Sequence, residues 1–140
     1  MGTVLAGCSM VAVTKLAAPP TATILLTEDD SEIRDLISAF LGGLGYRVLA
    51  AADAAEALLL LEAHGEIALL LTDVILPGGT TGFALARRAH RQRPELKIIY
   101  ASGHARTGER PAPHELLGPF LAKPFRLAEL KRQIETVLRP

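Results

Sequence analysis

The chain has 140 residues, as many acidic as basic side chains, and a formal net charge of zero. This length suits one domain built around one hydrophobic core. A neutral chain without a basic stripe disfavours direct binding of nucleic acid. No segment reaches the roughly 18 to 20 consecutive apolar residues of a membrane span, so no membrane association is expected. Cys8 is the only cysteine, which excludes an internal disulfide and favours a reducing, cytoplasmic compartment.

Residues 1–22 are predicted to form a disordered N-terminal tail, and residues 23–140 the folded domain. The tail ends near the pair Pro19-Pro20. Its segment Leu5-Ala6-Gly7-Cys8 is similar to the small-residue pattern before a lipid-modified cysteine. However, no basic residue precedes Cys8 and the apolar stretch is short, which argues against a secretory signal.

After Pro20, strand and helix signals alternate along the chain. Short apolar runs predict strands at 24–27, 46–50, 68–72, 97–101 and 118–122. Apolar residues at helical spacing predict helices at 33–44, 53–64, 82–93 and 127–138. The first helix is expected to begin at a cap on Asp30 or Ser31, and the third to end before Pro94.

The segment between the fourth and fifth strands departs from this alternation. Gly108, Pro111 and Pro113 fall where a fourth helix is expected. Any helix there is predicted to be confined to about 112–117, or the segment to be irregular. The chain is therefore predicted to be an α/β protein with a flavodoxin-like, doubly wound, five-stranded parallel sheet, (βα)5, whose fourth helix is short or irregular.

Polar side chains follow the ends of several predicted strands. Glu28 and Asp29 follow the first strand, Asp73 the third, Ser102 the fourth and Lys123 the fifth. Each residue alone has an ordinary structural explanation as a turn former, a helix cap or a solvated side chain. The carboxyl ends of parallel strands lie on one edge of the sheet, so we expect these five side chains to converge.

A converging set of carboxylates predicts a particular chemistry. Neighbouring carboxylates repel one another, and a hard divalent cation, Mg²⁺ or Mn²⁺, relieves that repulsion. With the cation beside it, Asp73 is free to attack a phosphoryl group, while Lys123 and Ser102 hold the other phosphoryl oxygens. The pattern therefore predicts a site that forms an acyl phosphate.

Three segments carry a resemblance to a known family. The sequences at 26–34, 72–79 and 121–125 resemble the receiver domain of bacterial two-component response regulators, and the similarity extends over about 23–138. The resemblance implies that Asp73 is the phosphoacceptor and that Glu28, Asp29 and the backbone carbonyl of Ile75 complete the metal site. It also implies that Lys123 contacts the phosphoryl group and precedes a cis bond to Pro124.

The same resemblance implies partners and a switch. A histidine kinase or a histidine phosphotransfer protein would donate the phosphoryl group, and the chain would act as a monomer or weak dimer. Ser102 would take the switch hydroxyl position and Phe120 the aromatic switch position. Because phenylalanine has no hydroxyl, Phe120 is expected to report the switch by packing alone.

Two residues are expected to modulate the site. Ile75 is apolar and does not orient an attacking water, which predicts a long-lived phosphoryl group. His104 is expected to cover the site, with positioning of water as the alternative. The loop at 78–82 is one residue longer than the commonest form, which resembles receivers of hybrid kinases, whereas 99–104 resembles a single-domain subgroup.

Other functions fit the same fold. A hydrolase with a strand-end Asp nucleophile typically has a second Asp two residues later, where this chain has Ile75. A flavin carrier needs a phosphate-binding loop after the first strand, where Glu28 and Asp29 would repel phosphate. A receiver-like interaction module that needs no phosphorylation is the remaining alternative. We predict a signalling domain rather than an enzyme.

Overall fold

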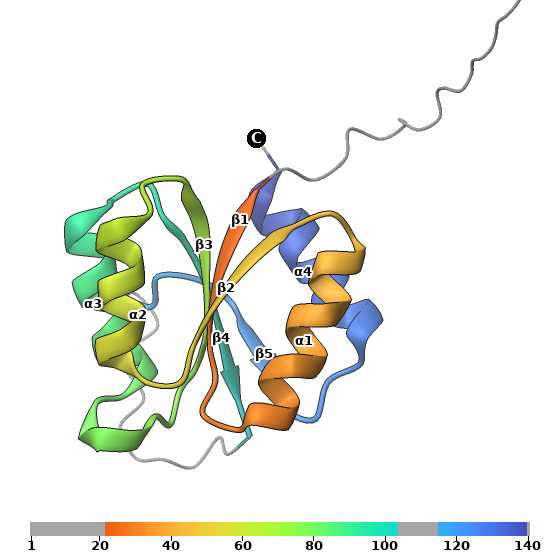
Figure 1. Cartoon of the computed structure of the whole chain (residues 1–140), viewed down its shortest axis with the longest axis horizontal. Helices are drawn as coiled ribbons and strands as arrows, with labels where there is room; N and C mark the ends of the chain where they lie inside the picture. Colours follow the sequence, from red (N-terminus) through yellow and green to blue (C-terminus); the bar gives the residue numbers. More distant parts are fainter. Residues whose placement is uncertain (1–21, 104–114, 140) are drawn as a thin grey trace, which may run out of the picture.

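Five parallel strands form one sheet in the order β2-β1-β3-β4-β5 (Figure 1). The computed structural model describes residues 22–103 and 115–139. The strands are β1 (Thr23–Thr27), β2 (Arg47–Ala51), β3 (Ile67–Asp73), β4 (Lys97–Ser102) and β5 (Phe120–Ala122). The predicted tail falls outside the described residues except for residue 22, so its disorder stays a prediction.

Helices cover both faces of this sheet, as predicted for a doubly wound fold. On one face lie α1 (Ser31–Gly43) and α4 (Leu127–Leu138), and on the other lie α2 (Ala54–Ala63) and α3 (Gly82–Gln92) (Figure 1). Each face has its own cluster of buried apolar side chains. The central strand β3 supplies Leu70 to one cluster and Leu69 and Leu71 to the other, because successive side chains of a strand point to opposite faces.

Local sequence explains where the helices begin. The Asp30 carboxylate accepts hydrogen bonds from the backbone nitrogens of Glu32 and Ile33 at 2.9 and 3.2 Å, which caps α1. Asp53 caps α2 in the same way. These caps matter for the site, because the cap of α1 turns the chain directly after β1.

The chain between β4 and β5 is described only in part. Residues 112–114 of the predicted fourth helix lie outside the described residues, and 115–117 belong to no α-helix. In Figure 1 the label α4 therefore marks the last helix. Gly118 then returns the chain against β4, where a Cβ atom would overlap the carbonyl oxygen of Ile98. Among the described residues, no helix is long and apolar enough to cross a membrane.

Candidate functional site at the carboxyl ends of the strands

The carboxyl ends of the strands lie along one edge of the sheet, at the bottom of Figure 1. The parallel register pairs Thr27 of β1 with Thr72 of β3, so Glu28 and Asp73 follow side by side. It also pairs Asp73 with Ala101, the residue before Ser102 at the end of β4. The topology thus gathers residues that are far apart in the sequence.

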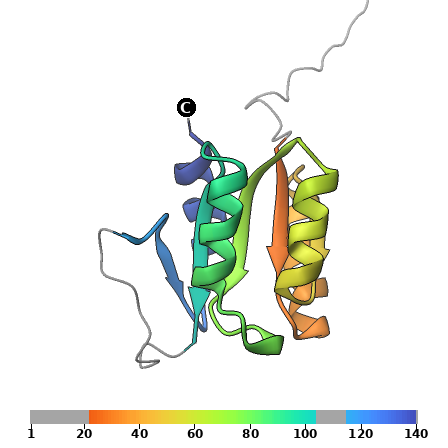
Figure 2. The same ribbon diagram turned by 90° about the vertical axis from the view of Figure 1, so that its left-hand side faces the viewer.

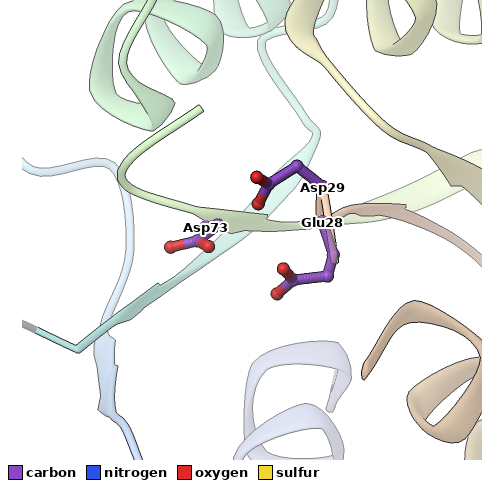
Figure 3. A group of neighbouring side chains, drawn as sticks. All are labelled: Glu28, Asp29 and Asp73. Carbon is purple, nitrogen blue, oxygen red and sulfur yellow. The ribbon is translucent and has the colours of Figure 1, made fainter. Parts of the chain in front are cut away.

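Three carboxyl groups meet at this edge (Figure 3). One carboxylate oxygen from each of Glu28, Asp29 and Asp73 lies within 4.8 Å of the others. Glu28 is buried, with 3% of its surface exposed, whereas Asp73 is half-buried and Asp29 is exposed. The cluster therefore opens to solvent on the Asp29 side, where a small ion has access.

Lys123 joins two of these carboxylates. Its Nζ atom lies 3.0 Å from Oε1 of Glu28 and 3.1 Å from Oδ2 of Asp73. Burial alone would lower the pKa of the Lys123 ammonium, but its hydrogen bonds and the negative charges of Glu28 and Asp73 outweigh burial and raise that pKa. Lys123 therefore stays a cation beside Asp73.

Backbone contacts fix the loop that carries the acidic residues. Oε2 of Glu28 accepts a hydrogen bond from the backbone nitrogen of Asp30 at 3.0 Å. Nη1 of Arg34 donates to the backbone carbonyl of Glu28 at 2.8 Å. On β3, the Thr72 hydroxyl donates to the carbonyl of Asp73 at 2.9 Å. These contacts orient Glu28 and Asp73 before any ligand binds.

The loop after Asp73 packs closely on the end of β3. The backbone nitrogen of Gly82, the first residue of α3, donates to the carbonyl of Val74 at 2.6 Å. A Cβ atom on Gly82 would overlap the carbonyl oxygen of Asp73, so the close approach requires glycine. Ile75 forms an isolated bridge with Thr81, and 52% of Ile75 is exposed beside the site.

An aromatic cluster joins α3 to β4 and to the start of β5. The rings of Phe83, Tyr100 and Phe120 are 5.1 to 5.8 Å apart. Tyr100 is buried, and its hydroxyl accepts a hydrogen bond from the backbone nitrogen of Leu117 at 3.3 Å. Phe120, the expected switch aromatic, is thus packed inward in this structure.

Most of the predicted site residues come together. Glu28, Asp29, Asp73 and Lys123 form one cluster, and the carbonyl of Ser102 accepts from the backbone nitrogen of Lys123 at 2.9 Å. The bond between Lys123 and Pro124 is cis, as the resemblance implied. His104 lies outside the described residues, so its place beside the site stays a prediction.

Sequence reasoning missed three residues that shape the site. Arg34 was part of the motif at 26–34 but had no role, and nothing in its spacing indicates a bond to the carbonyl of Glu28. Gly82 was expected only as a helix start, and its close approach to the carbonyl oxygen of Asp73 depends on tertiary packing. Tyr100 was expected only as a strand residue, and its hydrogen bond depends on tertiary packing.

A doubly wound sheet that carries an acidic cluster and a lysine at its strand ends is the arrangement of a phosphoacceptor signalling domain. Comparison with known proteins identifies the family: residues 24–135 match the model of the response regulator receiver domain. The chain belongs to this family, whose members are signalling domains of two-component systems.

Individual relatives agree with this assignment. The chain is 37% identical over 118 residues to the response regulator receiver protein CpdR of Brucella abortus, covering 82% of this chain and 95% of CpdR. It is 34% identical over 120 residues to the sensor kinase CckA of the same organism, covering 84% of this chain. The crystal structure of the receiver domain from the hybrid histidine kinase CckA superposes with a TM-score of 0.71 at 33% identity, covering 84% of this chain and all of that one.

These relatives differ greatly in length. The chain spans 13% of CckA and 49% of the transcriptional regulatory protein GltR of Pseudomonas aeruginosa, but nearly all of CpdR. In each case the match covers 82–84% of this chain, so it includes most of residues 24–135, which match the receiver domain model.

Proposed function

We propose that Asp73 accepts a phosphoryl group from a histidine kinase or a histidine phosphotransfer protein. The observation that supports this most is the position of Lys123, whose ammonium contacts both Glu28 and Asp73 at 3.0 and 3.1 Å. A fixed cation beside a half-buried carboxylate suits a reaction that brings further negative charge to that carboxylate. We also propose that the domain extends over 23–140, because the elements from β1 to α4 form one sheet and the helices that cover it.

The transfer is a substitution at phosphorus. A carboxylate oxygen of Asp73 attacks the phosphorus of phosphohistidine, a P–O bond forms, and the P–N bond breaks. The bonding electron pair leaves with the imidazole nitrogen, and Asp73 becomes an acyl phosphate. Lys123 then donates to the oxygens of the phosphoryl group instead of the free carboxylate, and the hydroxyl of Ser102 binds another of these oxygens.

The acidic cluster suits Mg²⁺ or Mn²⁺, because all its side-chain donors are oxygens and one of them, Asp29, faces solvent. We propose that Glu28, Asp29, Asp73 and the backbone carbonyl of Ile75 hold the ion. When bound, the ion supplies positive charge that offsets the charge of the phosphoryl group. Glu28 already bonds Lys123 and the backbone of Asp30, so it is placed to reach the ion through water rather than directly.

An apolar groove beside the site suits a helical phosphodonor. The groove has a volume of about 450 Å³ and is bounded by α1 and the segment that follows β5. Its apolar lining comprises Ile33, Leu36, Ile37, Pro124, Phe125 and Leu127. Lys123 and Gly103 line the end nearest the acidic cluster.

Two residues of this groove are unusually exposed. Leu36 is 57% and Ile33 is 37% exposed. An amphipathic helix that lays its apolar face on such a groove buries these side chains. Such a helix would bring its phosphohistidine to the end of the groove where Lys123 and Asp73 meet.

Phosphorylation by a small donor tests the central proposal. The chain is incubated with acetyl phosphate and Mg²⁺, and its intact mass is measured. We expect a gain of one phosphoryl group in the wild type and in Asp35→Asn, an exposed carboxylate of α1 outside the cluster, but none in Asp73→Asn. A gain in Asp73→Asn equal to that of the wild type would show that another residue is the acceptor.

A second experiment tests the groove. Leu36→Asn should slow transfer from a phosphorylated histidine phosphotransfer protein and leave labelling by acetyl phosphate unchanged. The matched control is Leu59→Asn, because Leu59 is 66% exposed but lies on α2, on the other face of the sheet. Equal rates of protein-to-protein transfer in the two variants would contradict the proposed docking site.

A further inference from the structure

An arginine face on α3 lies apart from the acidic cluster. We give this name to Arg87, Arg88 and Arg91, which are all exposed, on a helix that contains no acidic residue. Each residue of an α-helix is rotated by about 100° from the one before, so the three side chains leave the helix within an arc of about 100°. The sequence showed no long basic stripe, but the helix gathers three of its charges on one surface. Figure 2 shows α3 on the side of the molecule that faces the viewer.

Structural needs explain this face only in part. Basic residues in the last turn of a helix interact favourably with the helix dipole, which accounts for His90 and Arg91. Arg87 and Arg88 lie in the middle of α3, where the dipole has little effect. Arg91 is also four residues from Arg87 and three from Arg88, spacings at which like charges repel. A helix with only a structural role would gain stability from an acidic residue at one of these positions.

Among the described residues, no ion pair involves the arginine face. The ion pairs found among the described residues use Arg47, His64, Lys123 and Lys131 as their cations. The face is therefore a concentration of positive charge on a chain whose net charge is zero. Arginine binds carboxylates through two parallel hydrogen bonds, so the chemistry it suits is an acidic partner.

α3 also begins against the backbone of Asp73, the proposed phosphoacceptor. Gly82 at its start packs against Asp73, and the neighbouring Phe83 contacts Tyr100 and Phe120. Arg87 follows Phe83 by four residues, on the next turn of the helix. A displacement of Phe120 or of the loop after Asp73 would therefore shift the arginine face.

We propose that the arginine face binds an acidic segment of a partner protein and that phosphorylation of Asp73 changes its affinity. The effect of phosphorylation rests on the proposed function, whereas the binding of an acidic segment does not. A protein segment is favoured over nucleic acid because the positive charge covers one side of a single helix and the chain as a whole is neutral.

A titration with a defined probe tests the surface. A fluorescein-labelled poly-glutamate peptide is titrated with the unphosphorylated full chain, and binding is followed by fluorescence anisotropy. We expect binding that weakens as salt is added. The double variant Arg88→Glu/Arg91→Glu should bind about tenfold more weakly or worse. Arg132→Glu/Arg139→Glu, which changes the net charge equally but alters exposed residues at the other face of the sheet, should bind as the wild type does.

Several results would overturn the proposal. The proposal is wrong if the wild type does not bind the peptide or if peptide binding weakens equally in both double variants. It is also wrong if a mixed-sequence DNA duplex binds the wild type more tightly than the peptide does. Urea midpoints of the two variants check that each is folded, and if Arg88→Glu/Arg91→Glu is unstable, the single variant Arg88→Glu replaces it. A second titration uses chain whose phosphorylation is confirmed by mass, and we expect a change in affinity of about fivefold or more. Unchanged affinity in confirmed phosphorylated chain would refute the link to the site, whereas no gain in mass would refute the proposed function instead.

Discussion

Replacing Lys123 with methionine should lower the free energy of unfolding by about 2 kcal/mol in the absence of divalent cations. The side chains of Lys123, Glu28 and Asp73 are 22%, 4% and 14% exposed, so their ion pairs are neither fully buried nor at the surface. Loss of one partner from a buried pair costs about 3–5 kcal/mol, and an exposed pair is worth about 0–1 kcal/mol. The value expected here lies between these limits. Without the ammonium, the carboxylates of Glu28 and Asp73 face each other unopposed.

The assay is urea unfolding in the presence of EDTA, with Lys131→Met as the matched control. Lys131 pairs with Glu135 at 2.9 Å, but the two side chains are 45% and 46% exposed. Loss of this pair along a helix should cost less than about 0.5 kcal/mol. Added Mg²⁺ should reduce the loss of unfolding free energy in Lys123→Met but not in Lys131→Met. The reason is that a bound cation replaces the missing positive charge at the acidic cluster only. Equal losses in the two variants, or no effect of Mg²⁺ on either, would refute this account of the site.

Three further predictions follow from single contacts. Ile75→Asn should shorten the lifetime of the phosphorylated chain several-fold, measured as loss of the phosphoryl mass with time, and an unchanged lifetime would mean that this position does not control water. Gly82→Ala should destabilise the chain by about 1–3 kcal/mol in urea because its Cβ overlaps Asp73, whereas Gly42→Ala, with open space around it, should not destabilise it. Tyr100→Phe should cost about 1 kcal/mol at neutral pH, because the Leu117 N–H loses its acceptor. Burial raises the pKa of the Tyr100 phenol above its ordinary value of 10.0, because the buried phenolate is disfavoured. The wild type therefore keeps its full stability below pH 10.0 and loses part of it as pH rises through the raised pKa, whereas Tyr100→Phe does not titrate there. The difference in unfolding free energy between wild type and Tyr100→Phe should therefore decrease in alkali. A difference that increases would contradict this prediction.

The sequence predicts the acidic cluster well because the cluster depends only on which residues end the strands. Glu28, Asp73 and Lys123 each follow an apolar run that reads as a strand, and a parallel sheet places such ends on one edge. The alternation of strands and helices, rather than any distance along the chain, carries this inference. The positions of the strand ends do not predict the individual contacts, such as which carboxylates Lys123 binds.

Contacts that join distant parts of the chain were not predictable in this way. Arg93 was expected only as the end of a helix before Pro94. In the structure its guanidinium donates to the backbone carbonyls of Leu61, His64 and Ile67, at the end of α2 and the start of β3. No local pattern relates Arg93 to carbonyls 26 to 32 residues away, because the relation arises only when α2 and α3 pack side by side. β5 is similarly shorter than its apolar run suggested, since Gly118 and Pro119 lead into it without belonging to it.

The aromatic cluster shows how tertiary packing changes the expected role of Phe120. From sequence, Phe120 was expected to act by packing alone, since it has no hydroxyl. The structure packs the ring of Phe120 beside Tyr100, with ring centroids 5.3 Å apart, and the hydroxyl of Tyr100 accepts a hydrogen bond from the backbone of Leu117. Movement of Phe120 would leave the ring of Tyr100 less tightly packed. This would weaken the hydrogen bond that the Tyr100 hydroxyl accepts from the backbone nitrogen of Leu117. We therefore expect phosphorylation to speed amide exchange at Leu117 in the wild type and to have little effect there in Tyr100→Phe, and equal acceleration in both would show that the hydroxyl takes no part.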